Sequence, residues 1–288
     1  MNKITPPELQ KKVEQAVRLI QAAARDTEVL EVSYSGGKDS DVILELTRMA
    51  DVPHRAIYKN TTIDPPGTVA HARARGAEVR MPEKNFITLV HENGIPNRFY
   101  RFCCRFLKEY KVLDKAVIGV RKSESNKRKE RYTEPTECKY YGAKRPENHI
   151  EAIYPILDWT DEDVERFLEW RGVKCAPVYY DEEGRFHVER RLGCMCCPLK
   201  SFKKRLADFE ENPRMARVYL RAAQRFRELH PDSRHTLRYK DVYEWFAREV
   251  FFEKQHHWEA HKASLFGDCD YKQMISERLK IDLSDLPF

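Results

Sequence analysis

One short segment combines glycines, hydroxyls and a lysine in a pattern that suits phosphate chemistry. It reads Ser35, Gly36, Gly37, Lys38, Asp39 and Ser40. Adjacent glycines let the backbone turn tightly and bring N–H groups close to an anion. Lys38 supplies a positive charge, and Asp39 could hold a magnesium ion or cap a helix. The pattern is not Walker A, which needs GxxxxGK[ST]. An ordinary capped glycine turn is the alternative, but the full hexapeptide favours phosphate binding.

Cysteines form a second pattern that could do chemistry. Cys103 and Cys104 are adjacent, and the pair Cys194 and Cys197 begins 90 residues after Cys104. Four thiolates suit an iron–sulfur cluster or a zinc ion equally well. Cys196 adds a further thiol and is an alternative ligand. Buried, reduced cysteines without a metal are the alternative, because cysteine is common in protein cores. We expect a metal site.

A basic segment could contact a bound anion. Residues 121–131 contain six basic and two acidic side chains. Arg121 comes directly after the strand-like run 115–120, and an arginine makes paired hydrogen bonds with phosphate or sulfate. We therefore expect Arg121 to contact a bound anion. A solvated charged loop is the alternative for such a run.

Other polar residues near the expected strand ends have two possible roles. Asp64 either lines the ligand cleft at the strand ends or is a turn residue before two prolines, and both interpretations stay open. Thr160 and Asp163 have the spacing of a helix N-cap with its reciprocal carboxylate, so a structural role is favoured for them. Trp159 suits a position in the core.

Strand-like runs alternate with helical patterns over the first two thirds of the chain. Helices are expected at 9–24 and 41–50, and strands at 29–34, 54–60, 77–81, 115–120 and 151–156. This alternation predicts a Rossmann-like α/β fold, a parallel sheet with helices on both faces. In such sheets the ligand lies beyond the carboxyl ends of the strands.

The character of the sequence changes near residue 198. Helical patterns follow at 213–230 and 238–266, and no strand is expected there. We therefore expect an α/β domain over 1–198 and a helical extension over 199–288.

Four arginines of the extension share one helical face. They are Arg214, Arg217, Arg221 and Arg225. Such a stripe can contact nucleic-acid phosphates. It can equally be a solvated face that is offset by Glu210, Glu211 and Glu228, and this second interpretation is favoured.

Composition limits the class of protein. The chain has 288 residues, a formal charge of +6 and 41% hydrophobic residues, and a mass of 34.1 kDa. Recurring apolar runs argue against disorder. No stretch approaches the roughly 20 apolar residues that span a bilayer, and the first residues lack the apolar core of a signal peptide. Eight cysteines without such a signal argue for thiols or metal ligands rather than disulfides. We expect a cytoplasmic protein without a membrane partner.

Six motifs in a fixed order carry a resemblance to a known family. The hexapeptide resembles the PP-loop of the adenine-nucleotide α-hydrolase superfamily. It is followed by NTTIDPPGT (60–68), RFCCRFLK (101–108), GVRKSESNKR (119–128), YPILDWTDEDV (154–164) and RLGCMCCP (191–198). Together they resemble the phosphoadenosine-phosphosulfate (PAPS) reductase family, over roughly residues 29–198. That family includes sulfonucleotide reductases, the small subunit of bacterial ATP sulfurylase and relatives that act in DNA phosphorothioation.

The resemblance implies a nucleotide site and a metal site. Active PP-loop proteins bind ATP with Mg²⁺ and cut it between the α- and β-phosphates. The nucleotide-binding residues that this implies are Ser35, Gly36, Gly37, Lys38, Asp39, Ser40, Asp64, Arg121 and Arg128, with Lys38, Asp39 and Arg121 as catalytic residues. Adenylylsulfate reductases that hold a [4Fe–4S] cluster have a similar arrangement of paired cysteines. The resemblance thus favours iron–sulfur over zinc at Cys103, Cys104, Cys194 and Cys197.

Three functions compete. The favoured one is an ATP-using enzyme of sulfur metabolism that adenylylates an acceptor, which could be sulfate, a nucleic-acid backbone, a tRNA base or a small metabolite. The alternative is a sulfonucleotide reductase with a [4Fe–4S] cluster. Two departures weaken it: reductases usually have a degenerate phosphate loop, and their C-terminal Glu-Cys-Gly-Leu-His motif is missing here, although Cys269 is present. The third is a non-catalytic module that binds nucleotide or nucleic acid.

Overall fold

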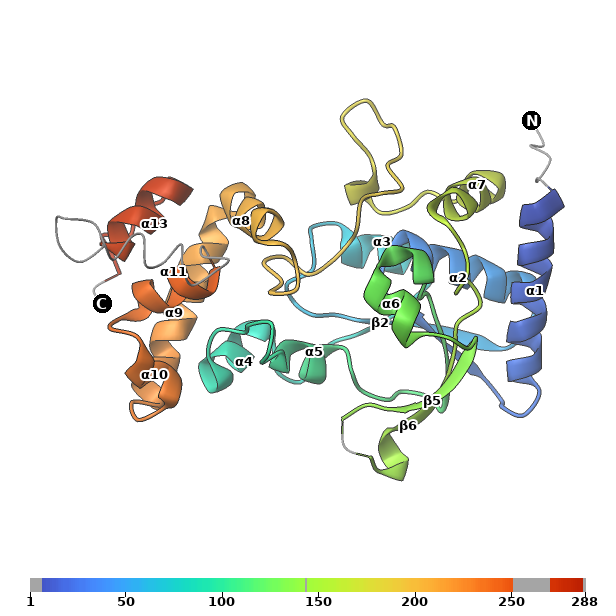
Figure 1. Cartoon of the computed structure of the whole chain (residues 1–288), viewed down its shortest axis with the longest axis horizontal. Coiled ribbons are helices and arrows are strands. Elements are labelled where there is room, and N and C mark those ends of the chain that lie inside the picture. Colours follow the sequence, from blue (N-terminus) through green and yellow to red (C-terminus); the bar gives the residue numbers. More distant parts are fainter. Residues whose placement is uncertain (1–6, 143, 251–269, 287–288) are drawn as a thin grey trace. The chain divides into compact units, whose positions relative to one another are not determined.

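The chain folds into two compact units. The computed structural model describes residues 7–142, 144–250 and 270–286. The first unit contains the described residues up to 60, then 64–82 and 107–193. The second contains 61–63, 83–106 and the described residues from 194 onward. Figure 1 follows the chain through both units.

A six-stranded sheet forms the centre of the first unit. Its strands are β1 (Leu30–Tyr34), β2 (His54–Lys59), β3 (Glu78–Arg80), β4 (Lys115–Ile118), β5 (Thr136–Tyr140) and β6 (His149–Ile153). They lie in the order β3-β2-β1-β4-β6-β5. All neighbouring pairs are parallel except β5 and β6. The Rossmann-like α/β fold and all five expected strands are therefore confirmed.

The edge strand β5 was not expected. Its residues alternate between exposed and partly buried, and none of them is fully buried. Glu137 and Lys139 stand within it, so it carries no apolar alternation from which a strand is predicted. Charged side chains are typical of edge strands, where they discourage pairing with other chains.

Helices cover the sheet and supply most of the core of the first unit. They are α1 (Pro7–Ala24), α2 (Lys38–Met49), α3 (Thr68–Ala74), α6 (Asn126–Arg131) and α7 (Asp161–Arg171), with 3₁₀ turns at Lys122–Glu124, Pro146–Asn148 and Pro177–Tyr179. α2 packs between α1 and α7. Thr160 caps α7 by accepting the Asp163 N–H, and Trp159 is buried in the core. Both expectations for these residues are confirmed.

The strand order reverses beside β1, and this places the candidate site. The chain runs from β1 outward through β2 and β3, and then returns to the other side of β1 for β4. Ser33 of β1 pairs in register with Ile118 of β4. The carboxyl ends of these strands therefore meet at the point where α/β sheets bind ligands. The loop Ser35–Ser40 follows β1, and Gly119 follows β4.

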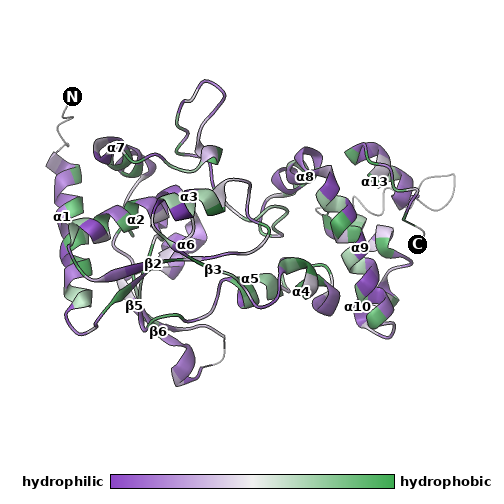
Figure 2. Cartoon of the chain, turned by 180° about the vertical axis from the view of Figure 1, so that it is seen from behind, coloured by the Kyte–Doolittle hydropathy of each residue, from purple (hydrophilic) through white to green (hydrophobic). Residues whose placement is uncertain are grey.

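The second unit is helical. Its helices are α4 (Phe86–Asn93), most of α5 (Phe102–Leu107), α8 (Phe202–Glu211), α9 (Pro213–Leu229), α10 (Arg234–Arg238), α11 (Val242–Val250) and α13 (Tyr271–Leu279). Phe209, Tyr219 and Phe246 meet ring to ring in its core, at centroid distances of 5.3–6.2 Å. Figure 2 shows that α9 carries both hydrophobic and hydrophilic residues, as an amphipathic helix does.

The expected division of the chain at residue 198 stays a prediction. By packing, the second unit also includes 61–63 and 83–106, because α4 lies against α9. Among the described residues, no strand follows residue 198. The helix expected over 238–266 is observed as α11 in part, and the remainder, like Cys269, lies outside the described residues.

Candidate functional site

The loop Ser35–Ser40 forms a tight turn between β1 and α2. Gly36 has φ +78°, a backbone conformation that disfavours residues with a Cβ atom. A Cβ atom there would also lie 2.8 Å from Thr68 Cγ2, so backbone conformation and lack of space both require glycine. The Ser40 hydroxyl donates to the Gly37 carbonyl at 2.7 Å. Gly37 is the N-cap of α2 and provides no side-chain cap. Because no side chain of residue 37 caps α2, the partial positive charge of the helix start is available to an anion.

A hollow of about 310 Å³ opens at this turn. Gly119, at the end of β4, forms part of its wall; a Cβ atom there would lie 3.0 Å from the Asp39 carbonyl oxygen. The full lining is Ser33, Ser35, Gly37, Lys38, Asp39, Ser40, Ile118, Gly119, Glu124, Arg128, Tyr179, Arg191 and Leu192. Three cations and two carboxylates thus face a space that hydroxyls and glycine backbone also line, and this suits a phosphate group.

Lys38 is held at the bottom of this hollow. Its side chain is only 3% exposed, and its ammonium lies 3.4 Å from Asp39 Oδ2 and 3.4 Å from the Arg190 carbonyl oxygen. The Tyr179 hydroxyl accepts the backbone N–H groups of Lys38 and Leu192, at 3.1 and 3.2 Å. Burial raises the pKa of Tyr179 to about 12, so this ring stays neutral at ordinary pH. Tyr179 thereby joins the loop Ser35–Ser40 to the segment that carries Arg191.

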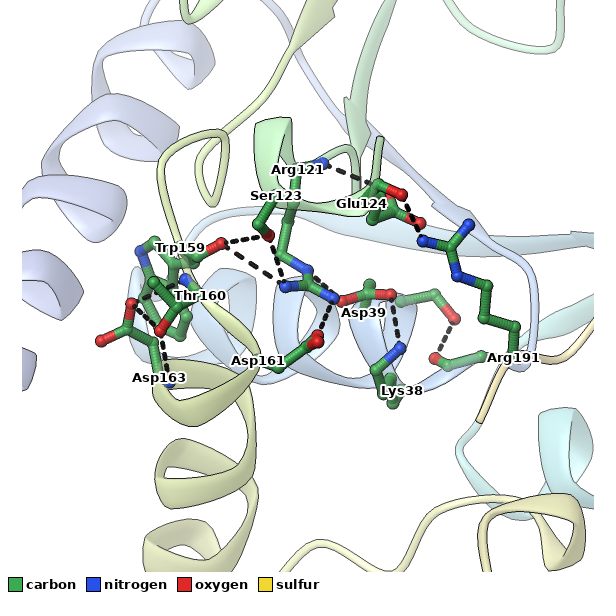
Figure 3. A network of polar contacts seen from close by, with 12 residues as sticks. Lys38, Asp39, Arg121, Ser123, Glu124, Trp159, Thr160, Asp161, Asp163 and Arg191 are labelled. Atoms are coloured by element: carbon green, nitrogen blue, oxygen red, sulfur yellow. Dashed lines mark hydrogen bonds and ion pairs between the residues drawn. The ribbon is translucent and has the colours of Figure 1, made fainter. Parts of the chain in front are cut away.

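Arg121 lies beside the hollow rather than in its lining. It is 1% exposed, and its Nε donates to Asp39 Oδ1 at 2.6 Å. One Nη donates to Asp161 at 2.7 Å, and the other to Ser123 Oγ at 2.9 Å and to the Trp159 carbonyl at 3.4 Å. Figure 3 shows this network. Arg121 therefore orients Asp39, and its expected contact with an anion stays a prediction.

Arg128 and Arg191 form the cationic wall of the hollow. Arg128 forms an ion pair with Glu124, four residues earlier. Arg191 donates to the Glu124 carbonyl oxygen at 2.5 Å. Burial, together with the nearby charge of Arg191, lowers the pKa of Arg128. Two guanidinium groups that repel each other are a strong attractor for an anion placed between them.

Sequence reasoning found Arg128 through the family resemblance but missed Arg191 and Tyr179. Arg190 directly precedes the cysteine motif RLGCMCCP and Arg191 is its first residue, and this adjacent pair of arginines is a signal that could have been used. Tyr179 gave no such signal, because a tyrosine in a 3₁₀ turn resembles any core aromatic residue.

Asp64 has the features of a turn residue. It is half-buried, and Tyr58 donates its hydroxyl to Asp64 Oδ2 at 2.6 Å. The next residues form a turn in which Thr68 donates through both its N–H and its hydroxyl to the Pro65 carbonyl. Within the described part of the chain, Asp64 is not among the residues that line the hollow. Its role in nucleotide binding stays a prediction.

Cys103 lies within electrostatic reach of three other cysteines in the second unit, Cys104, Cys194 and Cys197. Cys103 and Cys104 lie on α5, and Cys194 and Cys197 lie in the loop before α8. A hydrogen bond with Cys104, burial, and charge on Cys104, Cys197 and Cys194 together raise the pKa of Cys103. This coupling joins two pairs that are far apart in the sequence. The neighbouring strip 61–63 holds the cysteine loop, since Met195 donates its N–H to the Ile63 carbonyl at 2.8 Å.

Cys196 lies in a different environment. It is 3% exposed, has φ 57° and donates its N–H to Asp208 at 2.6 Å. Burial and the Asp208 charge raise the pKa of its thiol. Its role as an alternative ligand stays a prediction.

The side chains present at this site indicate whether a metal ion or cluster could be held there. Over the described ranges, no three His, Cys, Asp or Glu side chains stand in the arrangement of a formed metal site. The chemistry of the four thiols nevertheless fits one. Because each thiolate raises the cost of the next, they can ionise together only when a cation compensates them. All four are free of disulfides.

A buried hydroxyl within electrostatic reach of the cysteines also supports a metal ion or cluster at this site. Tyr219 is 2% exposed, and in the described structure its hydroxyl has no hydrogen-bond partner. Burial and then charge on Cys196, Cys103, Cys197 and Cys194 raise its pKa well above the ordinary value. An unpaired buried donor is costly, and a cluster held by these thiolates would supply acceptors for it.

The arginine stripe of α9 is partly neutralised. Arg217 pairs with Asp285 and also donates to the Asp282 carbonyl. Arg221 reaches Asp285 at 3.1 Å, and Arg225 reaches Glu228 at 3.1 Å. These contacts support the interpretation as a solvated face, and nucleic-acid contact through this stripe stays a prediction.

No described helix has both the length and the apolar character needed to cross a bilayer.

Comparison with known proteins identifies relatives. The family model named phosphoadenosine phosphosulfate reductase domain matches residues 30–200. An uncharacterized protein of Methanocaldococcus jannaschii is 30% identical in an alignment of 179 residues that covers 59% of this chain and 41% of that protein. This chain thus spans about two fifths of the length of that curated relative.

Among solved structures, two similar ones have low TM-scores. The phosphoadenylyl-sulfate reductase of Candida auris is 14% identical, with a TM-score of 0.42 over 60% of this chain and 90% of that chain. A U34-tRNA thiolase of Methanococcus maripaludis, solved with its [4Fe–4S] cluster, is also 14% identical. Its TM-score is 0.36, over 85% of this chain and 91% of that one.

Proposed function

Because this chain belongs to the phosphoadenosine phosphosulfate reductase family, we propose that it is an enzyme that binds Mg–ATP at Ser35–Ser40 and adenylylates an acceptor. A nucleophilic atom of the acceptor attacks the α-phosphorus. The bond from the α-phosphorus to the oxygen that bridges to the β-phosphate breaks. Pyrophosphate leaves with that electron pair, and the acceptor carries AMP.

One observation carries this proposal: the hollow at the loop joins an uncapped helix start to three cations. Lys38, Arg128 and Arg191 line it together. Departure of pyrophosphate builds negative charge on the β- and γ-phosphates, and positive groups that are already in place stabilise that charge without reorganisation. A site that only held a nucleoside would not need three cations.

Each residue at the loop has a proposed role. Lys38 and Arg191 contact the phosphates, and Arg128 acts with them. Asp39 would hold the Mg²⁺ that arrives with the nucleotide, because it is one of the two acidic residues that line the hollow. Arg121 keeps that carboxylate in place through the 2.6 Å contact. Asp64 is proposed to lie at the edge of the nucleotide site.

The cysteine set is proposed to hold a [4Fe–4S] cluster, with zinc as the alternative. Cys103, Cys104, Cys194 and Cys197 would be the ligands, and Cys196 is the alternative ligand. When bound, such a group would supply redox or sulfur chemistry or would order the second unit. Iron, sulfide and zinc analysis of anaerobically prepared protein distinguishes the two, and protein with neither metal overturns this part.

Calorimetry with three ligands tests the nucleotide. Mg–ATP, adenylylsulfate and phosphoadenylylsulfate are each titrated into anaerobically prepared protein. Selective binding of Mg–ATP is expected. Arg191→Gln should weaken it about ten-fold, which is the effect of losing a hydrogen bond to a charged group. Arg185→Gln is the matched control, because that arginine is 72% exposed and pairs with Asp181 in the same unit.

Turnover tests the reaction itself. With candidate acceptors present, release of AMP and pyrophosphate from Mg–ATP is expected, and Lys38→Met should abolish it. ATP binding without either product would favour a non-catalytic nucleotide-binding module. Selective binding of a sulfonucleotide would instead favour the sulfonucleotide reductase, an alternative that the coupled cysteines of the second unit support.

A further inference from the structure

The exposed aromatic side chains of one stretch in the second unit have no role in the sites described above, although Cys103 and Cys104 lie between them in the sequence. Within Arg98–Phe106, Phe99 is 100% exposed, Phe106 is 49% exposed and Tyr100 is 45% exposed. Single exposed apolar residues are common on protein surfaces. Three large rings within eight residues, one of them wholly in solvent, indicate a binding surface. We call this stretch the 98–106 platform.

The platform is also strongly basic. Arg98, Arg101 and Arg105 alternate with the rings, and no acidic residue occurs between 98 and 106. The Arg105 guanidinium lies 5.5 Å from the centroid of the Phe106 ring. Arg98 donates to the Lys200 carbonyl at 3.4 Å, so the platform is joined to the start of α8. There Lys203 and Lys204 are exposed as well.

The backbone holds the tip of the platform in place. The Asn97 side-chain oxygen accepts the N–H groups of Phe99 and Tyr100, each at 2.9 Å. The Tyr100 hydroxyl donates to Asn93 Oδ1 at 2.9 Å. Phe99 therefore projects into solvent from a closed turn. A surface that is ordered before binding loses less entropy when a ligand stacks on it.

We propose that the 98–106 platform binds single-stranded nucleic acid. Unpaired bases would stack on the exposed rings, and the arginines would neutralise the phosphates between those bases. Both features match the same ligand, because a single strand alternates flat rings with negative charges. A duplex keeps its bases stacked and leaves Phe99 without a partner. An acidic protein would satisfy the arginines but not the rings.

The inference names a nucleic acid as the acceptor of the proposed adenylylation, and in that respect rests on the proposed function. The binding itself does not depend on ATP. Binding is therefore measured without nucleotide, and release of AMP and pyrophosphate is measured separately. If no nucleic acid binds although AMP and pyrophosphate are released, this inference alone is wrong. If nucleic acid binds but neither product is released, the proposed function alone is wrong.

Fluorescence anisotropy of the full chain tests the proposal. The probes are labelled RNA and DNA strands of about 12 nucleotides and the corresponding DNA duplex, with poly-glutamate as the competitor. Both single strands should bind more tightly than the duplex, and the tighter of the two identifies RNA or DNA as the natural class. Equal binding of the duplex, or displacement by poly-glutamate at matched charge, would overturn the proposal in favour of a general acidic partner.

Variants locate the binding. Phe99→Ala should weaken single-strand binding about five-fold or more, as the loss of one stacked base predicts. Arg101→Gln should lower the salt dependence by about 0.7 in log–log slope. Phe99 is fully exposed, so its replacement does not threaten folding. Leu237→Ala, at a 73% exposed apolar residue of α10, and Arg225→Gln, on the α9 stripe, are matched controls. If these controls weaken binding as much as Phe99→Ala does, the platform is not the site.

Discussion

The Arg121 guanidinium lies 2.6 Å from the Asp39 carboxylate and so connects the segment after β4 to the first turn of α2. Arg121 is 1% exposed, and the same guanidinium reaches Asp161 at the start of α7. One buried side chain thus ties together three segments around the phosphate loop. The carboxylate that we assign to Mg²⁺ takes its position from this contact.

Arg121→Gln should therefore destabilise the fold and weaken Mg–ATP binding together. Removing one partner of a largely buried ion pair costs about 3 kcal/mol, because the other charge is left uncompensated. Urea denaturation measures the free energy of unfolding. Asp161→Asn is the control, because that carboxylate is 53% exposed and its loss should cost at most about 1 kcal/mol. Equal effects of the two variants would show that Arg121 does not act as this connection.

Gly36→Ala should impair the loop more than the same change at a comparable glycine. Gly36 has φ +78°, and its Cβ would meet Thr68 Cγ2 at 2.8 Å. Gly184 has φ +77° but open space around it, so Gly184→Ala carries the backbone strain alone, about 1–2 kcal/mol. The difference in unfolding free energy isolates the clash. Mg–ATP affinity should fall in Gly36→Ala only, and unchanged affinity there would contradict the assigned site.

Metal loading should weaken as the pH falls. A hydrogen bond with Cys104, burial and neighbouring thiolate charge all raise the pKa of Cys103, so its thiol is protonated in the metal-free protein. A metal must displace that proton, and lower pH favours the protonated side. Titration of iron and sulfide, or of zinc, at several pH values should show less binding at lower pH, with release of about one proton for each cysteine ligand.

Cysteine variants test which of the thiols bind the metal. Cys194→Ser should lose the metal, whereas Cys138→Ser, at an exposed thiol on β5, should retain it. Binding that is independent of pH, or that survives Cys194→Ser, would contradict the assigned ligands.

Tyr219→Phe should have opposite effects on the metal-free and the loaded protein. In the described structure the Tyr219 hydroxyl is buried without a partner, and such a group costs about 1–3 kcal/mol. Removing it should stabilise the metal-free protein. If the hydroxyl donates to the cluster, the same change should destabilise the loaded protein and shift its visible absorption or electron paramagnetic resonance spectrum. A spectrum identical to that of the unchanged protein would separate Tyr219 from the cluster.

Local patterns in the sequence were sufficient for the main elements. The apolar runs at β1 and β2 predict buried parallel strands, and glycines between a strand and a helix predict the phosphate turn. β5 escaped prediction because its edge position needs no apolar alternation. The inclusion of 83–106 in the helical unit escaped as well, because it depends on the packing of α4 against α9 rather than on local composition.

What the sequence by itself determined is the chemistry available at each point. The sequence predicts a phosphate loop at Ser35–Ser40 because the properties of glycine and of a helix start are local, and it predicts metal ligands at the paired cysteines from the chemistry of the thiolate alone. Only the tertiary structure decided which groups face each other. It placed Arg191 and Tyr179 at the loop, turned Arg121 toward Asp39, and brought Cys103 within reach of Cys194. The contacts Arg121–Asp39, Cys103–Cys194 and Tyr179–Lys38 join residues 82, 91 and 141 positions apart, and at such separations packing and burial, not spacing, determine which side chains meet.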